Sequence, residues 1–400
     1  MTGFAAAGKR GNAARQIRIM LAFFSFAAGG ITGGAIGVAW LAIRDTWNLP
    51  TASLGILLLA MTSGFLSGSF VSGYFVTRLG MGNTLFACSA VTTLGLLGFA
   101  LAPGWVPLIV IVALSGTGKG IFGASMNLYF ANHFNARLMN WLHACFALGA
   151  TLGPFAVQLT SSAGYDWRST WFVLALVQVV VSAAFYSTRT SWHTTGRMDS
   201  STKLDSPTML ETLRNPTVLL AMLLLFIFTG IESSAGNWSF TLFSEFRAIE
   251  RATAATWLGL YWGSFSLGRI LYGFIADRLR ADTSIRILIL LVLLGGLMFS
   301  VRDSMIVSVA GLMLVGLAQA PVTPLFYSMT PGRLGEKHAT NAIGFQMSAT
   351  GLGFSVLPAL LGAVADVSSY EILGPFLAAS ALLCLLLFKR IVRSEKLQPA

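Results

Sequence analysis

Two charged residues lie deep inside long apolar segments of the sequence. Lys119 belongs to the stretch 106–132, and Glu232 belongs to the stretch 216–243. A charge in hydrocarbon is costly, so each side chain should face protein or a water-filled cavity. A buried carboxylate can exchange a proton as its solvation changes, which is the chemistry that ion coupling needs. Glu232 is therefore the candidate ion-coupling residue, and a static ion pair with Lys119 or Arg269 is the alternative.

Uncharged polar residues in the same kind of segment offer paired donor and acceptor groups. Such groups can bind the hydroxyls of a sugar, although they also join membrane helices to one another. His143 could gate near the end of its segment, or it could be a hydrogen-bonded packing residue. The candidate substrate-binding residues are Lys119, Asn127, His143, Trp238, Gln319 and Gln346.

Aromatic residues near the segment ends allow two interpretations. They can stack on a ligand, or they can form the belt that aromatic side chains make at membrane interfaces. The belt is the favoured interpretation for this set, and Arg269 is interpreted as structural rather than as an anion site. The aromatic residues are Trp238, Tyr261, Trp262 and Tyr327.

Membrane-spanning helices must position these residues. Of the 400 residues, 55% are hydrophobic and 10% are charged, whereas a soluble domain has about 25% charged residues. The net charge of +11 comes from basic residues scattered between apolar runs, which indicates topology signals rather than a nucleic-acid surface. The sequence has no phosphate-binding GxxxxGK[ST] motif, no HExxH and no paired-cysteine motif. We therefore expect no enzyme activity, no cofactor and no metal.

Twelve segments are long enough to cross about 30 Å of hydrocarbon. The predicted fold class is an all-α polytopic membrane protein, with twelve transmembrane helices in two pseudo-symmetric six-helix bundles. The predicted spans are 19–43, 51–76, 82–103, 106–132, 138–161, 168–187, 216–243, 252–276, 284–301, 304–329, 338–365 and 372–388.

A long polar segment divides these spans six and six. We predict an N-terminal six-helix bundle over 1–187, a cytoplasmic linker over 188–215 and a C-terminal six-helix bundle over 216–400. Placing the N-terminus inside puts most of the 26 Lys and Arg residues in cytoplasmic segments. Both termini should therefore be cytoplasmic.

An internal repeat relates the two halves. Its register sets Lys119 opposite Gln319 and Thr32 opposite Glu232, so polar residues occupy equivalent places in both halves. Transporters often build a midplane site from such repeats, and these residues should converge on the pseudo-two-fold axis. Other matched positions are Gly68 with Gly268, Gly73 with Gly273, and Arg78 with Arg278.

Two loop motifs follow the second and eighth spans: GYFVTRLGMGN from Gly73 and GFIADRL from Gly273. They resemble the major facilitator superfamily, whose loop motif reads approximately G-x-L-A-D-R-x-G-R-R. The first copy has Thr77 where that motif has an acid, which weakens any charge lock built there. The resemblance implies conformational roles for Gly73, Arg78, Gly80, Gly273, Asp277 and Arg278.

Three further elements are similar to the fucose and glucose permease-like group of that superfamily: 116–154, GIESSAGNW at 230–238 and APVTP at 320–324. The resemblance implies a secondary transporter of a small polar solute, with a sugar as one candidate, in a bacterial inner membrane and as a monomer. Gly123 replaces the fourth-span acid of the fucose permease, and the first span has no acid. Proton coupling would then depend on Glu232, and sodium coupling or a uniporter are the alternatives.

Two other functions remain open at this stage. Lys119 could attract an anionic metabolite or a drug in a transporter or exporter. The chain could also be a transport-inactive sensor or structural membrane protein, because a fold does not decide a function. The expected partners are a small-molecule substrate, a coupling proton or sodium ion in the coupled case, and the lipid bilayer, with no nucleic acid.

Overall fold

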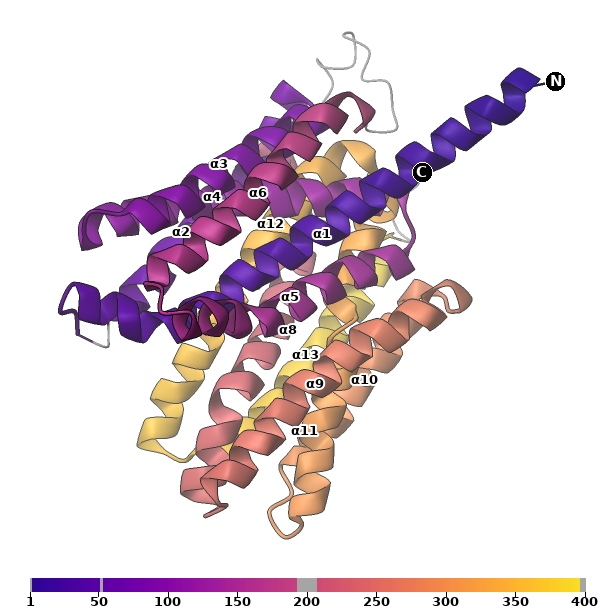
Figure 1. Ribbon diagram of the computed structural model, residues 1–400. Helices are drawn as coiled ribbons and strands as arrows, with labels where there is room; N and C mark the ends of the chain where they lie inside the picture. Colours follow the sequence, from indigo (N-terminus) through magenta and orange to yellow (C-terminus); the bar gives the residue numbers. More distant parts are fainter. Residues whose placement is uncertain (1, 51–52, 193–206, 396–400) are drawn as a thin grey trace. The chain divides into compact units, whose positions relative to one another are not determined.

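The computed structural model describes residues 2–50, 53–192 and 207–395, and these residues form helices without a β-strand among them (Figure 1). The chain folds into two compact units. Unit 1 comprises Met1–His133 and Trp141–Asp205, and unit 2 comprises Phe134–Asn140 and Ser206–Ala400. The predicted domain boundaries at 187 and 215 stay a prediction, and part of the predicted linker lies outside the described residues.

Unit 1 contains the helices that correspond to the first six predicted spans. Figure 1 shows these helices as long ribbons. They are α1 (Thr2–Thr46), α2 (Ser53–Leu79), α3 (Met81–Leu101), α4 (Trp105–His133), α5 (Ala136–Ser162) and α6 (Trp167–Thr188), and the turn η1 (Arg189–Ser191) follows. The first residues of α5 group with unit 2.

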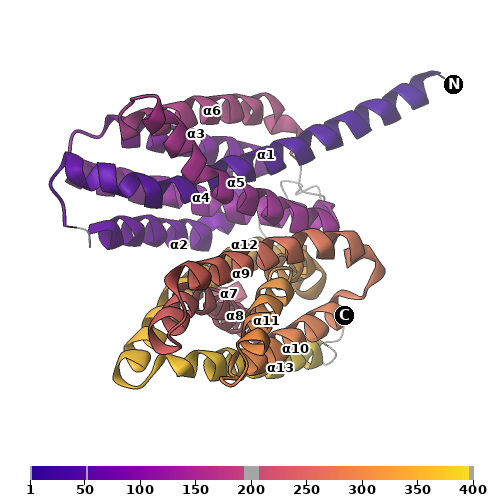
Figure 2. The same ribbon diagram turned by 60° about the horizontal axis from the view of Figure 1, so that its bottom comes forward.

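Unit 2 contains the remaining helices, which Figure 2 shows from another side. The short helix α7 lies within the segment predicted as a linker, and it starts at a capping box between Thr208 and Glu211. The elements are α7 (Met209–Arg214), α8 (Pro216–Thr241), η3 (Leu242–Phe246), α9 (Arg251–Ile275), η4 (Ala276–Arg278), α10 (Ala281–Phe299), α11 (Met305–Gln319), α12 (Val322–Val367), η5 (Tyr370–Ile372) and α13 (Leu373–Glu395).

The predicted span 304–329 is interrupted. It begins as α11 and continues as the first part of α12, because Pro321 and Pro324 lack the N–H groups that would continue the helical ladder. Gly335 then takes a φ of 74°, and the rest of α12 forms the next predicted span. Ten segments of the described residues therefore meet the length and hydropathy of a membrane span, and one of them, Met305–Ala365, holds two predicted spans.

Glycines bring helix backbones into direct contact in both units. A Cβ atom on Gly68 would lie 2.1 Å from the carbonyl oxygen of Thr117, and one on Gly268 would lie 2.1 Å from that of Leu317. Close approach through small residues drives helix association where hydrophobic burial cannot. The 200-residue repeat thus includes backbone contacts. A second pair keeps the same offset. A Cβ atom on Gly116 would lie 2.4 Å from the carbonyl oxygen of Met61, and one on Gly316 would lie 2.8 Å from that of Tyr261.

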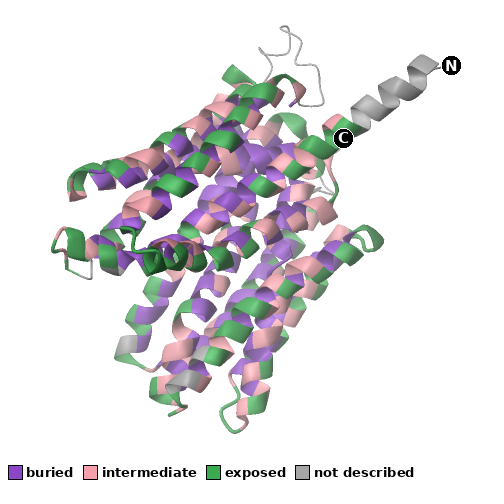
Figure 3. Ribbon diagram, in the orientation of Figure 1, coloured by how far each residue is buried: buried purple, intermediate pink, exposed green. Residues whose placement is uncertain are grey.

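The buried residues of each unit lie on the helix faces that meet other helices (Figure 3). Large apolar side chains cover the outer faces, as Leu101 (71% exposed), Leu159 (74%) and Val180 (65%) illustrate in unit 1. Extensive exposed apolar surface marks contact with lipid. The chain is a multi-pass membrane protein.

A pair of substitutions in α9 tests the backbone contact. Gly268→Ala should lower the free energy of unfolding of the purified protein by about 1–3 kcal/mol, and with it the unfolding temperature, because the added methyl group forces α9 away from the Leu317 carbonyl. Gly263→Ala is the matched control in the same helix, where nothing lies within 4 Å of an added Cβ. Equal unfolding temperatures for the two variants would show that this contact does not hold the helices together.

Candidate functional site

A cluster of polar side chains surrounds Glu232 inside unit 2. Glu232 lies on α8 and is half-buried, and its charge interacts electrostatically with Arg269 on α9. Tyr327 on α12 lies within electrostatic reach of both groups. Tyr261 donates its hydroxyl to the backbone oxygen of Glu232 at 3.0 Å. Among the described residues, no hydrogen bond reaches the Glu232 carboxylate, which can therefore change its protonation or its partner without breaking one.

Arg269 joins this cluster to the interruption between α11 and α12. Its Nε donates to the carbonyl oxygen of Ala320 at 3.2 Å, and its guanidinium lies 4.5 Å from the ring centre of Phe265. Pro324 has no N–H, so the carbonyl four residues earlier, on Ala320, has no helical donor. Arg269 supplies a replacement donor.

The predicted glutamines of unit 2 differ in what they can still bind. Gln319, the last residue of α11, donates its Nε2 to the carbonyl oxygen of Phe228 at 2.6 Å. Its Oε1 is buried without a hydrogen-bond partner among the described residues. Gln346 is also buried, and its Oε1 accepts from Thr330 at 3.0 Å. Gln319 thus retains an acceptor for a ligand, whereas the Gln346 carbonyl is already engaged.

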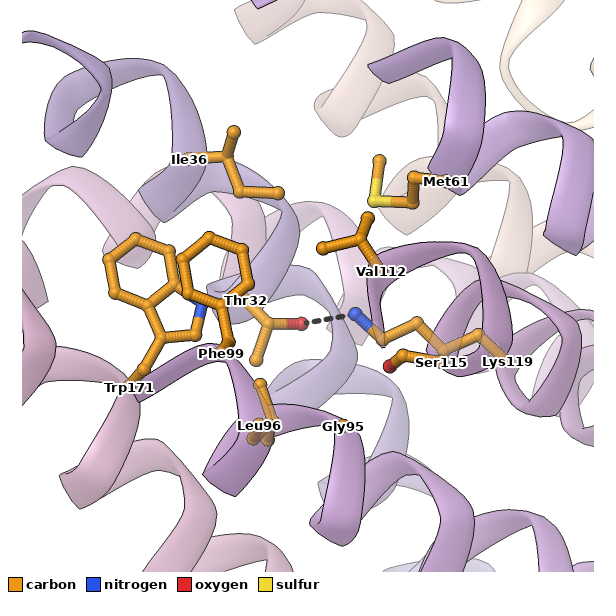
Figure 4. A pocket seen from close by; sticks show the side chains of 10 residues that line it. All are labelled: Thr32, Ile36, Met61, Gly95, Leu96, Phe99, Val112, Ser115, Lys119 and Trp171. Carbon is orange, nitrogen blue, oxygen red and sulfur yellow. Dashed lines mark hydrogen bonds between the residues drawn. The ribbon is translucent and has the colours of Figure 1, made fainter. Parts of the chain in front are cut away.

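Lys119 lies in a small cavity inside unit 1 (Figure 4). Its Nζ donates to Thr32 Oγ1 at 3.2 Å, which joins α4 to α1. The equivalent helices of unit 2 are joined through the equivalent residue of α11, Gln319, which donates to the Phe228 carbonyl one turn before Glu232, the counterpart of Thr32. The repeat therefore places a polar contact at the same helix pair in each unit, with a lysine in one and an amide in the other.

Asn127 and His143 form a second polar contact in unit 1. His143 Nε2 on α5 donates to Asn127 Oδ1 on α4 at 3.0 Å, and the imidazole meets the ring of Phe26 edge-on at 5.7 Å. Asn127 is fully buried. The structure therefore brings these two predicted residues together, and their role in binding stays a prediction.

The predicted aromatic belt is wrong for two of its members. Tyr261 is fully buried and Tyr327 is 2% exposed, so both lie inside unit 2 rather than at a lipid interface. Each hydroxyl has a partner there, as a buried tyrosine needs: Tyr261 bonds the Glu232 backbone oxygen, and Tyr327 bonds the Thr350 hydroxyl at 3.2 Å. Trp238 donates its Nε1 to the Pro358 carbonyl at 2.8 Å and contacts the Tyr370 ring at 5.0 Å. It ties α8 to α12.

In the second loop motif, the acidic residue Asp277 makes the polar contacts. Asp277 forms an ion pair with Arg137 at 3.0 Å and accepts from Asn135 at 2.9 Å, all within unit 2. Gly273 is buried in α9, and Arg278 is exposed at the end of η4.

In the first loop motif, the position of the acid forms no ion pair among the described residues. Thr77 stands there, and its hydroxyl donates to the backbone oxygen of Gly73 within α2 at 3.0 Å. Arg78 lies over the ring of Tyr74 at 5.3 Å. Gly80 takes a φ of 79° between α2 and α3, a conformation that favours glycine.

Three residues of the Glu232 cluster are absent from the predicted site: Arg269, Tyr261 and Tyr327. A signal for one of them exists in the sequence. The 200-residue register sets Tyr327 opposite Asn127, which was predicted to bind substrate. The register applied to that residue alone would have drawn attention to Tyr327.

Two bundles of apolar helices with half-buried ionisable groups inside them define the chain as a polytopic membrane protein. The sequence matches the Major Facilitator Superfamily over residues 19–305 and 250–400, and the chain belongs to this family. Its members are transporters, which confirms the expectation that the chain is not an enzyme.

Named relatives and a solved structure agree with this assignment. The human sodium-dependent glucose transporter 1 is 23% identical over 65% of this chain, which spans just over half, 57%, of that protein's length. The glucose/mannose transporter GlcP of Bacillus subtilis (strain 168) is 21% identical over 80% of this chain and 81% of its own. The structure of FucP in the outward conformation, a fucose:proton symporter of E. coli, covers 94% of this chain and 98% of that one at 13% identity, with a TM-score of 0.79. That likeness shows the fold.

A double-mutant cycle tests the contact between Arg269 and the helix interruption. Arg269→Gln should lower the free energy of unfolding, because the Ala320 carbonyl loses its donor. In a Pro324→Ala background the loss should be smaller by about 1–2 kcal/mol, because the new N–H can bond that carbonyl. Denaturant titration of the purified protein in detergent measures all four species.

Pro358→Ala provides the control for this cycle. It removes a proline from the same helix, α12, but supplies an N–H to a different carbonyl. Its combination with Arg269→Gln should be additive. A coupling no larger with Pro324 than with Pro358 would refute the proposed replacement donor.

Proposed function

We propose that this chain is a secondary transporter of a small, hydroxyl-bearing solute such as a sugar, and that it works by alternating access. Family membership supports transport, and the names of the human, Bacillus subtilis and E. coli proteins support a sugar-like solute. The observation that carries the proposal is the carboxylate of Glu232, held beside Arg269 inside a bundle of such a protein.

Amide and hydroxyl groups supply the binding chemistry for such a solute. Gln319 offers a buried acceptor without a partner among the described residues. Asn127, Gln346 and Tyr327 add groups that can exchange their present partners for the hydroxyls of a ligand. His143 and Trp238 complete the proposed binding set.

Glu232 is the proposed coupling group. Its carboxylate interacts with the charge of Arg269 but accepts no hydrogen bond from the described residues, so a proton or a sodium ion can compete for it. The two ions correspond to the sodium-dependent human relative and the E. coli proton symporter. The family fold alone does not select between these ions.

The chain would act as a monomer in a bacterial inner membrane. The distribution of basic residues favours cytoplasmic termini and a cytoplasmic linker over 188–215. The Asp277–Arg137 ion pair would hold one conformation of the second loop motif. The first copy would contribute only the turn at Gly80.

Substitution of Glu232 tests the coupling role. Glu232→Gln in liposomes should abolish accumulation driven by a proton or sodium gradient, because a neutral amide cannot take up a proton. For sodium, the amide loses the negative charge that compensates the cation, although its oxygen remains a possible ligand. Counterflow exchange of the same sugar should persist, because exchange needs no net ion movement. Uptake of labelled hexoses with and without each gradient measures both properties.

Glu245→Gln is the matched control, since Glu245 is exposed at the end of the same helical segment. It should leave both activities at the wild-type level. Gradient-driven accumulation by Glu232→Gln would remove the coupling role. Flux of anions only, or no flux of any compound in a panel of sugars, organic acids and drugs, would favour the anion-transporter or the transport-inactive alternative.

A further inference from the structure

A cavity inside unit 1 has the chemistry of an anion site. Its volume is about 20 Å³, and a cavity above about 10–15 Å³ can hold one water-sized particle. Side chains from α1, α2, α3, α4 and α6 line it, and Figure 4 shows the Lys119 ammonium reaching across it to Thr32. The rest of the lining is largely apolar, with the Phe99 and Trp171 rings stacked at 4.3 Å.

The charge of Lys119 has no acidic partner in this unit. The acidic residues of the described part of unit 1 are Asp45 and Asp166. Asp45 pairs with Arg44 at 3.0 Å, and Asp166 caps the start of α6 by accepting from the Arg168 N–H at 2.9 Å. Among the described residues, no carboxylate forms an ion pair with Lys119. A charge held inside a bundle needs a counter-charge, because burial without one is costly.

The polar groups around the cavity are mostly donors. An ammonium has three N–H groups, and Thr32 accepts one of them. The Thr32 hydroxyl donates its own hydrogen to the Gly29 carbonyl at 2.8 Å, so it offers none to the cavity. The Ser115 hydroxyl is free to donate, because no hydrogen bond among the described residues engages it, and Ser115 is only 9% exposed. Trp171 adds an indole, which can only donate.

The backbone of α3 makes room for this arrangement. Ser115 and Lys119 lie four residues apart on α4, so they share one helix face. Gly95 lies opposite, and a Cβ on it would come within 2.5 Å of Ser115 Oγ. Any larger residue at position 95 would therefore displace the serine hydroxyl. The glycine keeps that donor at the cavity.

We propose that this cavity binds one monovalent inorganic anion of about the size of chloride, with Lys119 as its counter-charge and Ser115 as a second donor. The volume excludes an organic solute, whose pockets span about 300–1,000 Å³. The anion is therefore a resident ligand of unit 1 and is distinct from the transported solute. The inference does not rest on the proposed transport function.

The internal repeat supports a site specific to unit 1. The equivalent positions in unit 2 carry Gln319 instead of the lysine and Val315 instead of the serine. Unit 2 therefore has neither the charge nor the hydroxyl donor at this place. Lys119→Gln copies into unit 1 the residue that the second half of the chain already uses at the same helix contact, which makes it a conservative test.

Anion titration of the purified full-length protein tests the proposal. In buffer with gluconate as the anion, added chloride should raise the unfolding temperature saturably, and bromide should do the same. Lys119→Gln should abolish this rise. Ser115→Ala should weaken the apparent chloride affinity roughly tenfold, by loss of one hydrogen bond to a charged group. Arg189→Gln, which changes another basic residue of unit 1 that stacks on Tyr186, should leave the response intact.

Crystals grown in bromide give an independent readout, because anomalous scattering should place bromide within hydrogen-bond distance of Lys119 Nζ. Equal responses to chloride and gluconate, an unchanged response in Lys119→Gln, or no bromide beside Lys119 would each overturn the proposal. If Lys119→Gln does not fold, the chloride affinity of Ser115→Ala decides: an affinity equal to that of the wild type would overturn the proposal. All readouts are of binding, so a failure of sugar transport would leave them unaffected.

Discussion

A polar group inside a bundle of membrane helices has no water to bond, so the chain must supply its partner. Arg269 shows this constraint most directly. Its guanidinium bonds the Ala320 carbonyl, which Pro324 leaves without a helical donor. Gln319, one residue earlier, donates to the Phe228 carbonyl on α8. The interruption of α11 and α12 thereby provides an acceptor that holds Arg269 in the cluster around Glu232.

The two units share a scaffold and differ in chemistry. Both bring a glycine of one helix against a carbonyl of the next, at Gly68 in unit 1 and at Gly268 in unit 2. On this shared frame, unit 1 carries a cation at Lys119 and unit 2 carries an amide at Gln319. The backbone contacts need small residues, whereas a polar position needs only some partner across the helix pair. The repeat therefore keeps its packing while its charges diverge.

The sequence was sufficient for the class, most of the helices and the family, because apolar length and the repeat are properties of the chain alone. It missed the break after Gln319 and the short helix α7. It singled out Glu232 and Lys119 as candidates, because a charge within an apolar segment is visible without a structure. The prediction of an aromatic belt failed for Tyr261 and Tyr327, since the sequence near a span end does not show whether an aromatic residue faces lipid or a neighbouring helix. The bond of Arg269 to Ala320 was also out of reach, because it depends on how α9 packs against the interrupted helices.

The break after Gln319 divides one predicted span into two helical segments, α11 and the first part of α12. Arg269, on a third helix, bonds the Ala320 carbonyl at this break, so a change in the angle between the two segments would change the distance between Arg269 and Ala320. The same guanidinium sets part of the electric field at Glu232. A mechanical movement of the backbone would therefore be transmitted as a change in local potential at the carboxylate, without any displacement of the carboxylate itself.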